Sequence, residues 1–326
     1  MPASSVQRGL ALIGQLLALE VERMRASGIA VGEDDYRGLY VSDAEADRLV
    51  QEAELDAANE GTASAERRME DVRNQLAALA RESDGALATL VKIGGLSDFE
   101  TGCLLLCLSS ETDLGTERLV AYTQDDVSKR RPRVDLALRV LEAAEQRDDR
   151  RSTFHADSPL RRMRFIALHD EQGQPHTPLL ARYVVLDARI AAYLMGERGI
   201  DEALLGLVER TRAPHSTALP EPLAGQVAGL AALPATSLKP AVAAVSGLDR
   251  TRILAVTHEV AAAAGLGVLR APVVSLAAEL GLEAGFQRAV REAALQESAL
   301  ILEGVDQLKL EDAEKLRVMA AEMCAP

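Results

Sequence analysis

Residues 97–108, Ser-Asp-Phe-Glu-Thr-Gly-Cys-Leu-Leu-Leu-Cys-Leu, decide the fold of this chain. Ser97 followed three residues later by Glu100 is a capping box, in which each side chain satisfies a backbone N–H at the start of a helix. The sequence therefore predicts a helix that begins at Asp98. Because residues 101–108 are almost entirely apolar, we expect this helix to be buried on most of its surface, at the centre of a core.

Two further helices and a β-hairpin are predicted after this helix. Residues 114–123 form one short helix, and Pro132 stands at the favoured first position of the next, whose apolar residues Val134, Ala137, Leu138 and Leu141 have helical spacing. Strand-like runs at 164–168 and 182–186 flank the turn-rich residues 170–175, and residues 188–195 predict a closing helix. This is the element order of a winged helix, so we expect residues 86–196 to be one α+β domain.

Several motifs in and around this region form a recognisable set. They are Tyr-Arg-Gly-Leu-Tyr-Val-Ser at 36–42, Leu-Ser-Asp-Phe-Glu at 96–100, Leu-Leu-Leu-Cys-Leu at 104–108, Tyr-Thr-Gln-Asp-Asp-Val at 122–127, Arg-Pro-Arg-Val-Asp-Leu-Ala-Leu at 131–138 and Leu-Leu-Ala-Arg at 179–182. The set resembles the winged-helix-variant domain that precedes the AAA module in a bacterial ATPase family encoded with phage-tail-like contractile injection systems. The resemblance covers most of the chain. In that family it implies ATP and Mg²⁺ as cofactors.

Composition favours a helical protein without a nucleic-acid or membrane role. Of the 326 residues 48% are hydrophobic but only 3% aromatic, so the core must be built from Leu, Val and Ala, which favours helix. The net charge of −14 weakens attraction to nucleic acid and to anionic membranes. The apolar run at 10–19 is bounded by Arg8, Glu20, Glu22 and Arg23, so it is neither a signal peptide nor a membrane span.

The cysteines indicate a core rather than a redox or metal site. There are three, and Cys103 and Cys107 lie one helical turn apart in the apolar helix, without the loop geometry of a disulfide. No zinc pattern is present, and this usage is typical of a reducing cytoplasm. We therefore expect a cytoplasmic protein.

Residues 1–85 are predicted to be an N-terminal helical region. An apolar stripe with helical spacing runs from Val6 to Met24, and the capping box that starts at Ser42 predicts another helix. After a break at Gly61, a heptad-like stripe follows at Met69, Val72, Leu76 and Leu79. This stripe is consistent with a short coiled coil or with docking onto the winged-helix core, and we favour docking because the stripe is short.

The rest of the chain is predicted to be a linker at 197–238, rich in Pro and small residues, and a partial α/β module at 239–326. Strand-like runs and helices alternate there, which implies a parallel sheet. In the AAA fold, the strand after the last of these helices lies between the first and the third run. We therefore expect the module to lack that strand. The predicted runs are 241–245, 267–276 and 298–302, and the predicted helices are 249–264, 282–297 and 311–323.

The turn after the first run stands where an AAA fold has its phosphate-binding loop. Such a loop needs glycines whose backbone N–H groups surround the phosphates, and a Lys for the terminal phosphates. Here Gly247 is retained, but the second Gly and the Lys are missing. Arg250 or Arg252 would be substitute cations, whereas Asp249 puts a negative charge where phosphate should bind. We therefore expect a degenerate loop or simply a capped helix start.

The run at 298–302 stands where the AAA fold holds magnesium. An ATPase needs one carboxylate there for the metal and a second to orient the attacking water. Glu303 and Asp306 are the candidate metal residues, and Gly304 replaces the catalytic carboxylate. No catalytic residue is therefore assigned, and no cofactor is expected to bind this chain.

Two basic clusters, at 129–133 and 161–164, offer a different interpretation. In a winged helix these basic residues would contact DNA phosphates. However, acidic residues adjoin the first cluster, and no aromatic residues alternate with the basic ones. We favour a solvated or internally paired surface.

The leading hypothesis is an ATPase-like protein of the injection-system family. The resemblance implies that it assembles, loads or remodels the particle through contacts with the particle's proteins or with its own copies. The alternatives are a winged-helix DNA-binding regulator and an ATPase that is active through an unorthodox loop.

Overall fold

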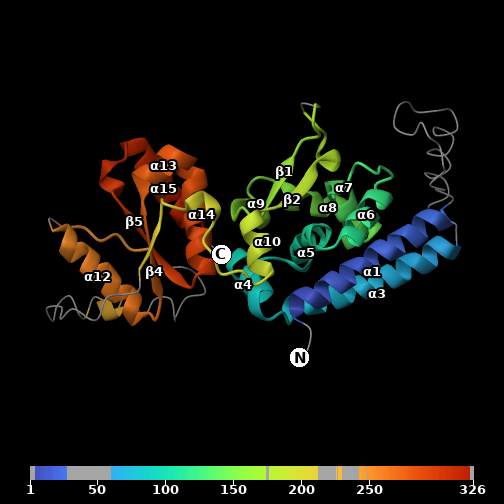
Figure 1. The fold of residues 1–326 in the computed structure, drawn as a ribbon, viewed down its shortest axis with the longest axis horizontal. Coiled ribbons are helices and arrows are strands. Elements are labelled where there is room, and N and C mark those ends of the chain that lie inside the picture. Colours follow the sequence, from blue (N-terminus) through green and yellow to red (C-terminus); the bar gives the residue numbers. More distant parts are fainter. Residues whose placement is uncertain are drawn as a thin grey trace. The chain divides into compact units, whose positions relative to one another are not determined.

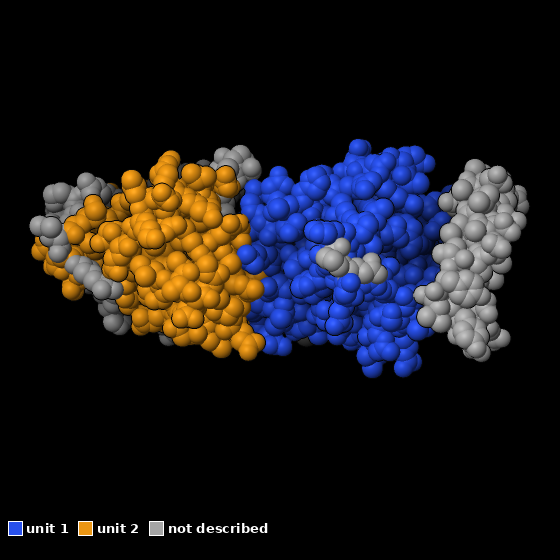
Figure 2. Space-filling model, turned by 90° about the horizontal axis from the view of Figure 1, so that it is seen from above, with its two compact units in different colours: residues 1–197 blue, residues 198–326 orange. Residues whose placement is uncertain are grey.

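The computed structural model describes residues 4–27, 60–173, 176–211, 225, 227–229, 242–247 and 249–323. The chain forms two compact units, residues 1–197 and 198–326 (Figure 2). Most of the described residues are helical, and each unit contains one small sheet (Figure 1). The mainly helical α+β class is confirmed. The predicted helix that begins at Ser42 lies outside the described residues.

Helix α5 (Asp98–Thr112) is the centre of the first unit. Its capping box forms as predicted, because the Ser97 side chain accepts from the Glu100 N–H while the Glu100 side chain accepts from the Ser97 N–H. Every residue from Phe99 to Ser109 is buried. Cys103 and Cys107 are free thiols within this stretch, and burial raises the pKa of both. The prediction of a buried central helix is confirmed.

The winged-helix elements surround α5. Helices α6 (Leu114–Thr123) and α7 (Val134–Leu141) follow it, and strands β1 (Ile166–His169) and β2 (Tyr183–Leu186) pair antiparallel from Ile166 opposite Leu186 to His169 opposite Tyr183. Helix α10 (Ala188–Leu194) closes the unit. Short helical turns that the sequence analysis did not identify connect α7 to β1 and precede β2: η1 (Ala144–Gln146), α8 (Arg147–Arg150), η2 (Arg151–Phe154), α9 (Pro159–Arg162) and η3 (Leu179–Ala181).

Pro132 does not begin α7, which corrects the sequence interpretation. The helix starts two residues later, and the segment before it runs beside β2. The Pro132 carbonyl accepts from the Val184 N–H at 2.8 Å, and the Val134 N–H donates to the Arg182 carbonyl at 3.0 Å. Arg133 and Tyr183 form an isolated antiparallel bridge between these bonds. Because pairing with β2 requires extended backbone, the helix is delayed to Val134.

Helices α1 (Ser5–Ala26) and α3 (Glu60–Arg81) form an antiparallel hairpin that packs on α5. The hairpin is tied at both ends: Ser5 Oγ donates to Asp84 at 2.5 Å, and Arg68 pairs with Glu22 at 2.6 Å. Gly9 of α1 approaches Leu105 of α5 so closely that an added Cβ would lie 2.7 Å from a Leu105 methyl. The helices therefore pair with each other and also dock on the core. Helix α4 (Gly85–Gly94) follows the hairpin.

The second unit contains a three-stranded sheet in the order β3-β4-β5. Strands β4 (Gly267–Pro272) and β5 (Ser298–Glu303) are parallel, whereas β3 (Glu209–Thr211) is antiparallel to β4. Helices α13 (Val273–Leu280), α14 (Leu282–Leu295) and α15 (Leu310–Met323) bury one face of the sheet. Helix α12 (Arg250–Ala263) lies on the opposite side of the strands (Figure 1).

Two features of this unit differ from the sequence predictions. Residues 242–245, within the first predicted strand, belong to no strand, because none of the described strands pairs with them. Conversely, β3 lies within the range 197–238 that was interpreted as a linker, as does the short turn η4 (Glu202–Leu204). The sheet is therefore mixed rather than purely parallel.

The burial of α5 predicts a large effect of a charge at its centre. We expect Leu105→Asp to lower the free energy of unfolding of the first unit by about 4 kcal/mol, because it places an unpaired carboxylate where the native side chain is fully buried. The matched control is Leu114→Asp at the start of the next helix, where the native side chain is 70% exposed. Denaturant unfolding measures both variants, and equal stabilities would show that α5 is not the core.

Candidate functional site

The predicted phosphate loop is a helix start that the chain caps with its own carboxylate. Asp249 Oδ1 accepts hydrogen bonds from the backbone N–H groups of Thr251 at 2.9 Å and Arg252 at 3.3 Å. Gly247 and Arg252 are exposed, and Arg250 is the first residue of the helix. A bound phosphate would need these same N–H groups and the same positive end of the helix dipole. Asp249 therefore occupies the position that a phosphate would take.

Glu303, the candidate magnesium ligand, forms an ion pair with an arginine. Glu303, at the end of β5, accepts from Arg270 Nε of β4 at 2.6 Å, and Glu209 of β3 accepts from the same guanidinium at 3.2 Å. The hydrogen bond to Glu303 raises the pKa of Arg270. Asp306 is exposed on the turn η5 (Val305–Gln307). A guanidinium satisfies the carboxylate oxygens that a hard cation would need.

The described residues therefore do not fit ATP with Mg²⁺. No group of three or more His, Cys, Asp or Glu side chains among them could hold a metal ion. The single glycine before α12, the Asp249 cap and the Arg270–Glu303 ion pair each differ from what a phosphate and metal site requires.

The first basic cluster is largely paired within the unit. Glu171 binds Lys129 and also lies 3.4 Å from Arg133, whose guanidinium carbon is 5.4 Å from the centre of the Tyr183 ring. Arg130 is within 3.9 Å of Glu117 and keeps 65% of its side chain exposed. These contacts agree with the interpretation of an internally paired surface, because pairing removes the positive potential that attracts phosphates.

In the second basic cluster, on and after α9, Arg161 contacts the chain itself, because its Nη1 donates to the Phe154 carbonyl at 3.2 Å. Arg164 has a φ of 51° at the entry to β1, so its backbone is in the left-handed region.

Helix α7, the third helix of the winged-helix order, is covered on most sides. Six of its eight residues are buried: Val134, Leu136, Ala137, Leu138, Val140 and Leu141. The others, Asp135 and Arg139, pair with each other at 2.9 Å. In DNA-binding winged helices, the corresponding helix offers its side chains to the major groove. Here little of the helix is left for such a contact.

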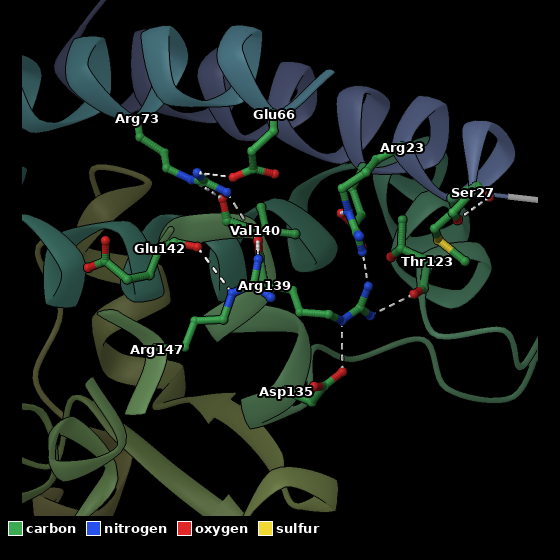
Figure 3. A network of polar contacts seen from close by, with 12 residues as sticks. Arg23, Ser27, Glu66, Arg73, Thr123, Asp135, Arg139, Val140, Glu142 and Arg147 are labelled. Atoms are coloured by element: carbon green, nitrogen blue, oxygen red, sulfur yellow. Dashed lines mark hydrogen bonds and ion pairs between the residues drawn. The ribbon is translucent and has the colours of Figure 1, made fainter. Parts of the chain in front are cut away.

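Arg139 connects α7 to the hairpin through a fully buried carboxylate. Glu20 of α1 binds Arg139 and also accepts from Arg23 Nε at 2.8 Å and Nη2 at 3.0 Å. Arg139 donates further to the Thr123 carbonyl at 2.9 Å, at the end of α6 (Figure 3). Burial alone would raise the pKa of Glu20. The hydrogen bond from Arg23 and the positive charges of Arg139, Arg23 and Arg147 outweigh it and hold that pKa below its usual value.

A second arginine fixes the other helix of the hairpin to α7. Arg73 of α3 is buried, and its guanidinium donates to the Val140 carbonyl at 3.1 Å and the Arg139 carbonyl at 3.2 Å, at the end of α7. Glu66 neutralises it at 2.7 Å (Figure 3). Positive groups are favourable at the carboxyl end of a helix. The sequence analysis assigned no role to Glu20, Arg73 or Arg139, because nothing in the local pattern connects them.

The comparisons with known proteins identify the domain. The family model described as a winged helix domain, variant, matches residues 6–208. The chain belongs to this family. The matched span includes the α1–α3 hairpin as well as the elements from α5 to α10, so the hairpin is part of the family's domain. Among curated proteins and solved structures, none matches this chain.

The Glu20 network predicts a pH-dependent contribution to stability. We expect Glu20→Gln to lower the free energy of unfolding by about 3 kcal/mol at pH 7, because the half-buried guanidinium groups of Arg23 and Arg139 lose a fully buried carboxylate partner. Since the pKa of Glu20 is lowered by folding, its contribution is present above the ordinary value of 4.5 and is lost as the pH falls through the folded pKa. The difference between variant and native protein should therefore shrink below about pH 4.5.

The matched control is Glu22→Gln on the same helix. Glu22 is 52% exposed and its partner Arg68 58% exposed, so this variant should change stability little at any pH. Denaturant unfolding between pH 3 and pH 7 compares them. Equal losses in the two variants would show that the buried network does not stabilise the unit.

The Asp249 cap predicts a difference between two substitutions. We expect Asp249→Ala to destabilise the first turn of α12 by about 1 kcal/mol, whereas Asp249→Asn keeps a side-chain acceptor and most of the stability. The hydrogen-exchange rates of the Thr251 and Arg252 amides measure this loss of the cap directly. Equal exchange in the alanine and native proteins would mean that the carboxylate does not cap the helix.

Proposed function

We propose that this winged-helix protein is an AAA-family ATPase-like protein with a degenerate nucleotide site. It acts in the cytoplasm in assembly, loading or remodelling of a contractile injection particle through contacts with the particle's proteins or with its own copies. The proposal rests on the resemblance of the sequence motifs. Its structural support is the covered α7 surface and the occupied phosphate position.

The arrangement of α7 favours protein contacts over DNA contacts. Arg139 is the basic side chain of this helix, and it is neutralised by Glu20 and Asp135. Glu20 of the hairpin and Asp135 of α7 itself thus take the place of DNA phosphates as partners of Arg139. The net charge of −14 also weakens attraction to DNA.

The capped start of α12 supports a role that does not depend on hydrolysis of a nucleotide. An anion that approached the Thr251 and Arg252 N–H groups would first have to displace Asp249, and it would then lie beside that carboxylate. Arg270 similarly competes with any cation for Glu303. These two contacts support a role through protein partners. None of the described helices is long and apolar enough to cross a membrane.

Calorimetry with ATP and Mg²⁺ tests the degenerate site. We expect no binding to the native chain, because both the phosphate and the metal positions are taken by the chain's own side chains. Asp249→Asn removes the repelling charge while retaining the cap, and this variant should also fail to bind, since the glycine-rich backbone is missing. Micromolar binding to the native chain would contradict the proposal, and Arg250→Ala and Arg252→Ala would identify the cation responsible.

Two binding measurements separate the proposed function from the DNA-binding alternative. The purified chain should co-sediment with injection particles and should not retain duplex DNA on filters at low salt. A winged-helix regulator would do the opposite, and its DNA affinity would fall steeply as salt increases. In that case Arg130→Glu, at an exposed position of the first basic cluster, would weaken DNA binding, whereas Arg67→Glu on the hairpin would serve as the charge-matched control.

A further inference from the structure

The loop between α6 and α7, residues 124–133, is held in one conformation by its own hydrogen bonds. The Gln124 side chain donates to the carbonyls of Lys129 at 2.7 Å and Arg131 at 2.9 Å, and it accepts from the Arg133 N–H at 2.9 Å. One side-chain amide therefore joins the beginning of the loop to three positions in its second half.

Val127 is the apex of this loop. Asp126 Oδ1 accepts from the Ser128 N–H at 2.8 Å and from the Ser128 hydroxyl at 2.6 Å, and the Lys129 N–H donates to the Asp126 carbonyl at 2.9 Å. These bonds close a turn around Val127, whose side chain is 86% exposed. Turns favour Gly, Pro, Asn, Asp and Ser, so the turn itself does not explain a β-branched apolar residue at its apex.

The loop is also anchored to the β1–β2 hairpin. Glu171, in the connection between these strands, binds Lys129 and lies 3.4 Å from Arg133. Both cations also lie over the Tyr183 ring of β2, at 5.9 Å and 5.4 Å from its centre. These two basic residues therefore fix the loop in place. A loop that is rigid before binding loses little conformational entropy when a partner binds.

Two other arginines of the loop are exposed together with Val127. Arg130 lies 3.9 Å from Glu117 and keeps most of its side chain exposed, and Arg131 is exposed as well. An exposed ion pair at that distance contributes little. The loop surface, which consists of Val127, Arg130 and Arg131, is thus an apolar apex accompanied by two positive charges. Its complement is an exposed apolar side chain accompanied by carboxylates.

The second unit also exposes a large apolar side chain. Leu310, the first residue of α15, is 87% exposed, and Val305 on the preceding turn η5 is 38% exposed. Among the described residues, Leu310 and Val127 are the two large apolar side chains with the greatest exposure, and they belong to different units. Because single exposed apolar residues are ordinary, the charges that accompany them decide whether they can form an interface.

The charges beside Leu310 are opposite in sign to those of the loop surface. Two acidic residues follow Leu310 in the first turn of α15, and a third is exposed on η5. They outnumber the one basic residue of this stretch, Lys309. These apolar and acidic residues form the corner surface: Asp306, Leu310, Glu311 and Asp312.

We propose that the loop surface of one copy of the chain binds the corner surface of a second copy. Val127 and Leu310 supply the apolar centre of the contact, and the arginines and carboxylates fix its orientation. The contact joins two different surfaces, so one loop surface and one corner surface stay unpaired in a dimer and further copies can add. The inference deepens the proposed function by specifying its contact between copies, and its role rests on that function.

Sedimentation equilibrium of the purified full chain at low salt tests this contact. The native chain should associate reversibly as its concentration rises, and the association should weaken with salt, because the surfaces are small and charged. Val127→Asp and Leu310→Asp should each stay monomeric. The matched control is Leu114→Asp at the other end of α6, which adds the same charge at an exposed apolar position and should associate as the native chain does. Thermal unfolding should show that all three variants keep their stability.

A mixture of the two monomeric variants distinguishes this contact from a symmetric one. Val127→Asp keeps the corner surface, and Leu310→Asp keeps the loop surface. The mixture should therefore form a dimer with one copy of each variant and nothing larger. A symmetric interface, in which each copy uses the same surface, would not be restored by mixing.

Charge reversal tests the pairing of the arginines with the carboxylates. Arg130→Glu with Arg131→Glu should weaken association about tenfold, and so should Glu311→Arg with Asp312→Arg. The second pair makes the chain less negative, so a general charge repulsion would strengthen association instead. All four changes in one chain should restore association, because the two surfaces are complementary again.

A native chain that stays monomeric, a Val127→Asp chain that associates as the native chain does, or a mixture without the dimer would overturn the inference. Co-sedimentation with injection particles tests the proposed function separately. A monomeric native chain that co-sediments would contradict the contact between copies and leave the proposed function intact. Self-association without co-sedimentation would support the contact and contradict the role at the particle.

Discussion

The burial of α5 is the constraint on which the first unit depends. A helix whose residues from Phe99 to Ser109 are all buried needs apolar partners around its whole circumference. Helices α6 and α7 and strand β2 cover part of it, and the α1–α3 hairpin covers the rest. This explains why the family's domain includes residues far upstream of the winged-helix elements. It also explains why α7 is enclosed, since the hairpin that completes the core around α5 lies against α7 as well.

Enclosure of α7 has an electrostatic consequence. Arg139 is only partly exposed, and Glu20 supplies it with a fully buried carboxylate from the hairpin in addition to Asp135 on its own helix. The same solution recurs in the second unit, where Glu303 pairs with Arg270 and Asp249 caps α12. In both units, charged side chains that the sequence analysis considered as ligand contacts instead pair with other groups of the chain.

The second unit combines two chemically different sheet faces. Ala271, Leu300 and Leu302 form an apolar face under α13, α14 and α15, whereas Arg270 and its carboxylate partners form a polar face under α12. The apolar face supplies the core, and α12 packs on the face that carries Arg270.

The amino-acid sequence by itself determined the elements whose signals are local. The start of α5 follows from hydrogen bonds between Ser97 and Glu100, three residues apart, and α12, α14 and α15 follow from the alternation of helical and strand-like segments. Only the tertiary structure decided which strands form. Residues 242–245 have strand composition but pair with no described strand, whereas β3 has two charged residues and pairs with β4, where Glu209 contacts Arg270. It also gave Glu20 its role, because its partner Arg139 lies 119 positions later and comes close only when α1 packs against α7. Local hydrogen bonds are encoded within a few residues, whereas strand pairing and buried ion pairs depend on segments that only the folded chain brings together.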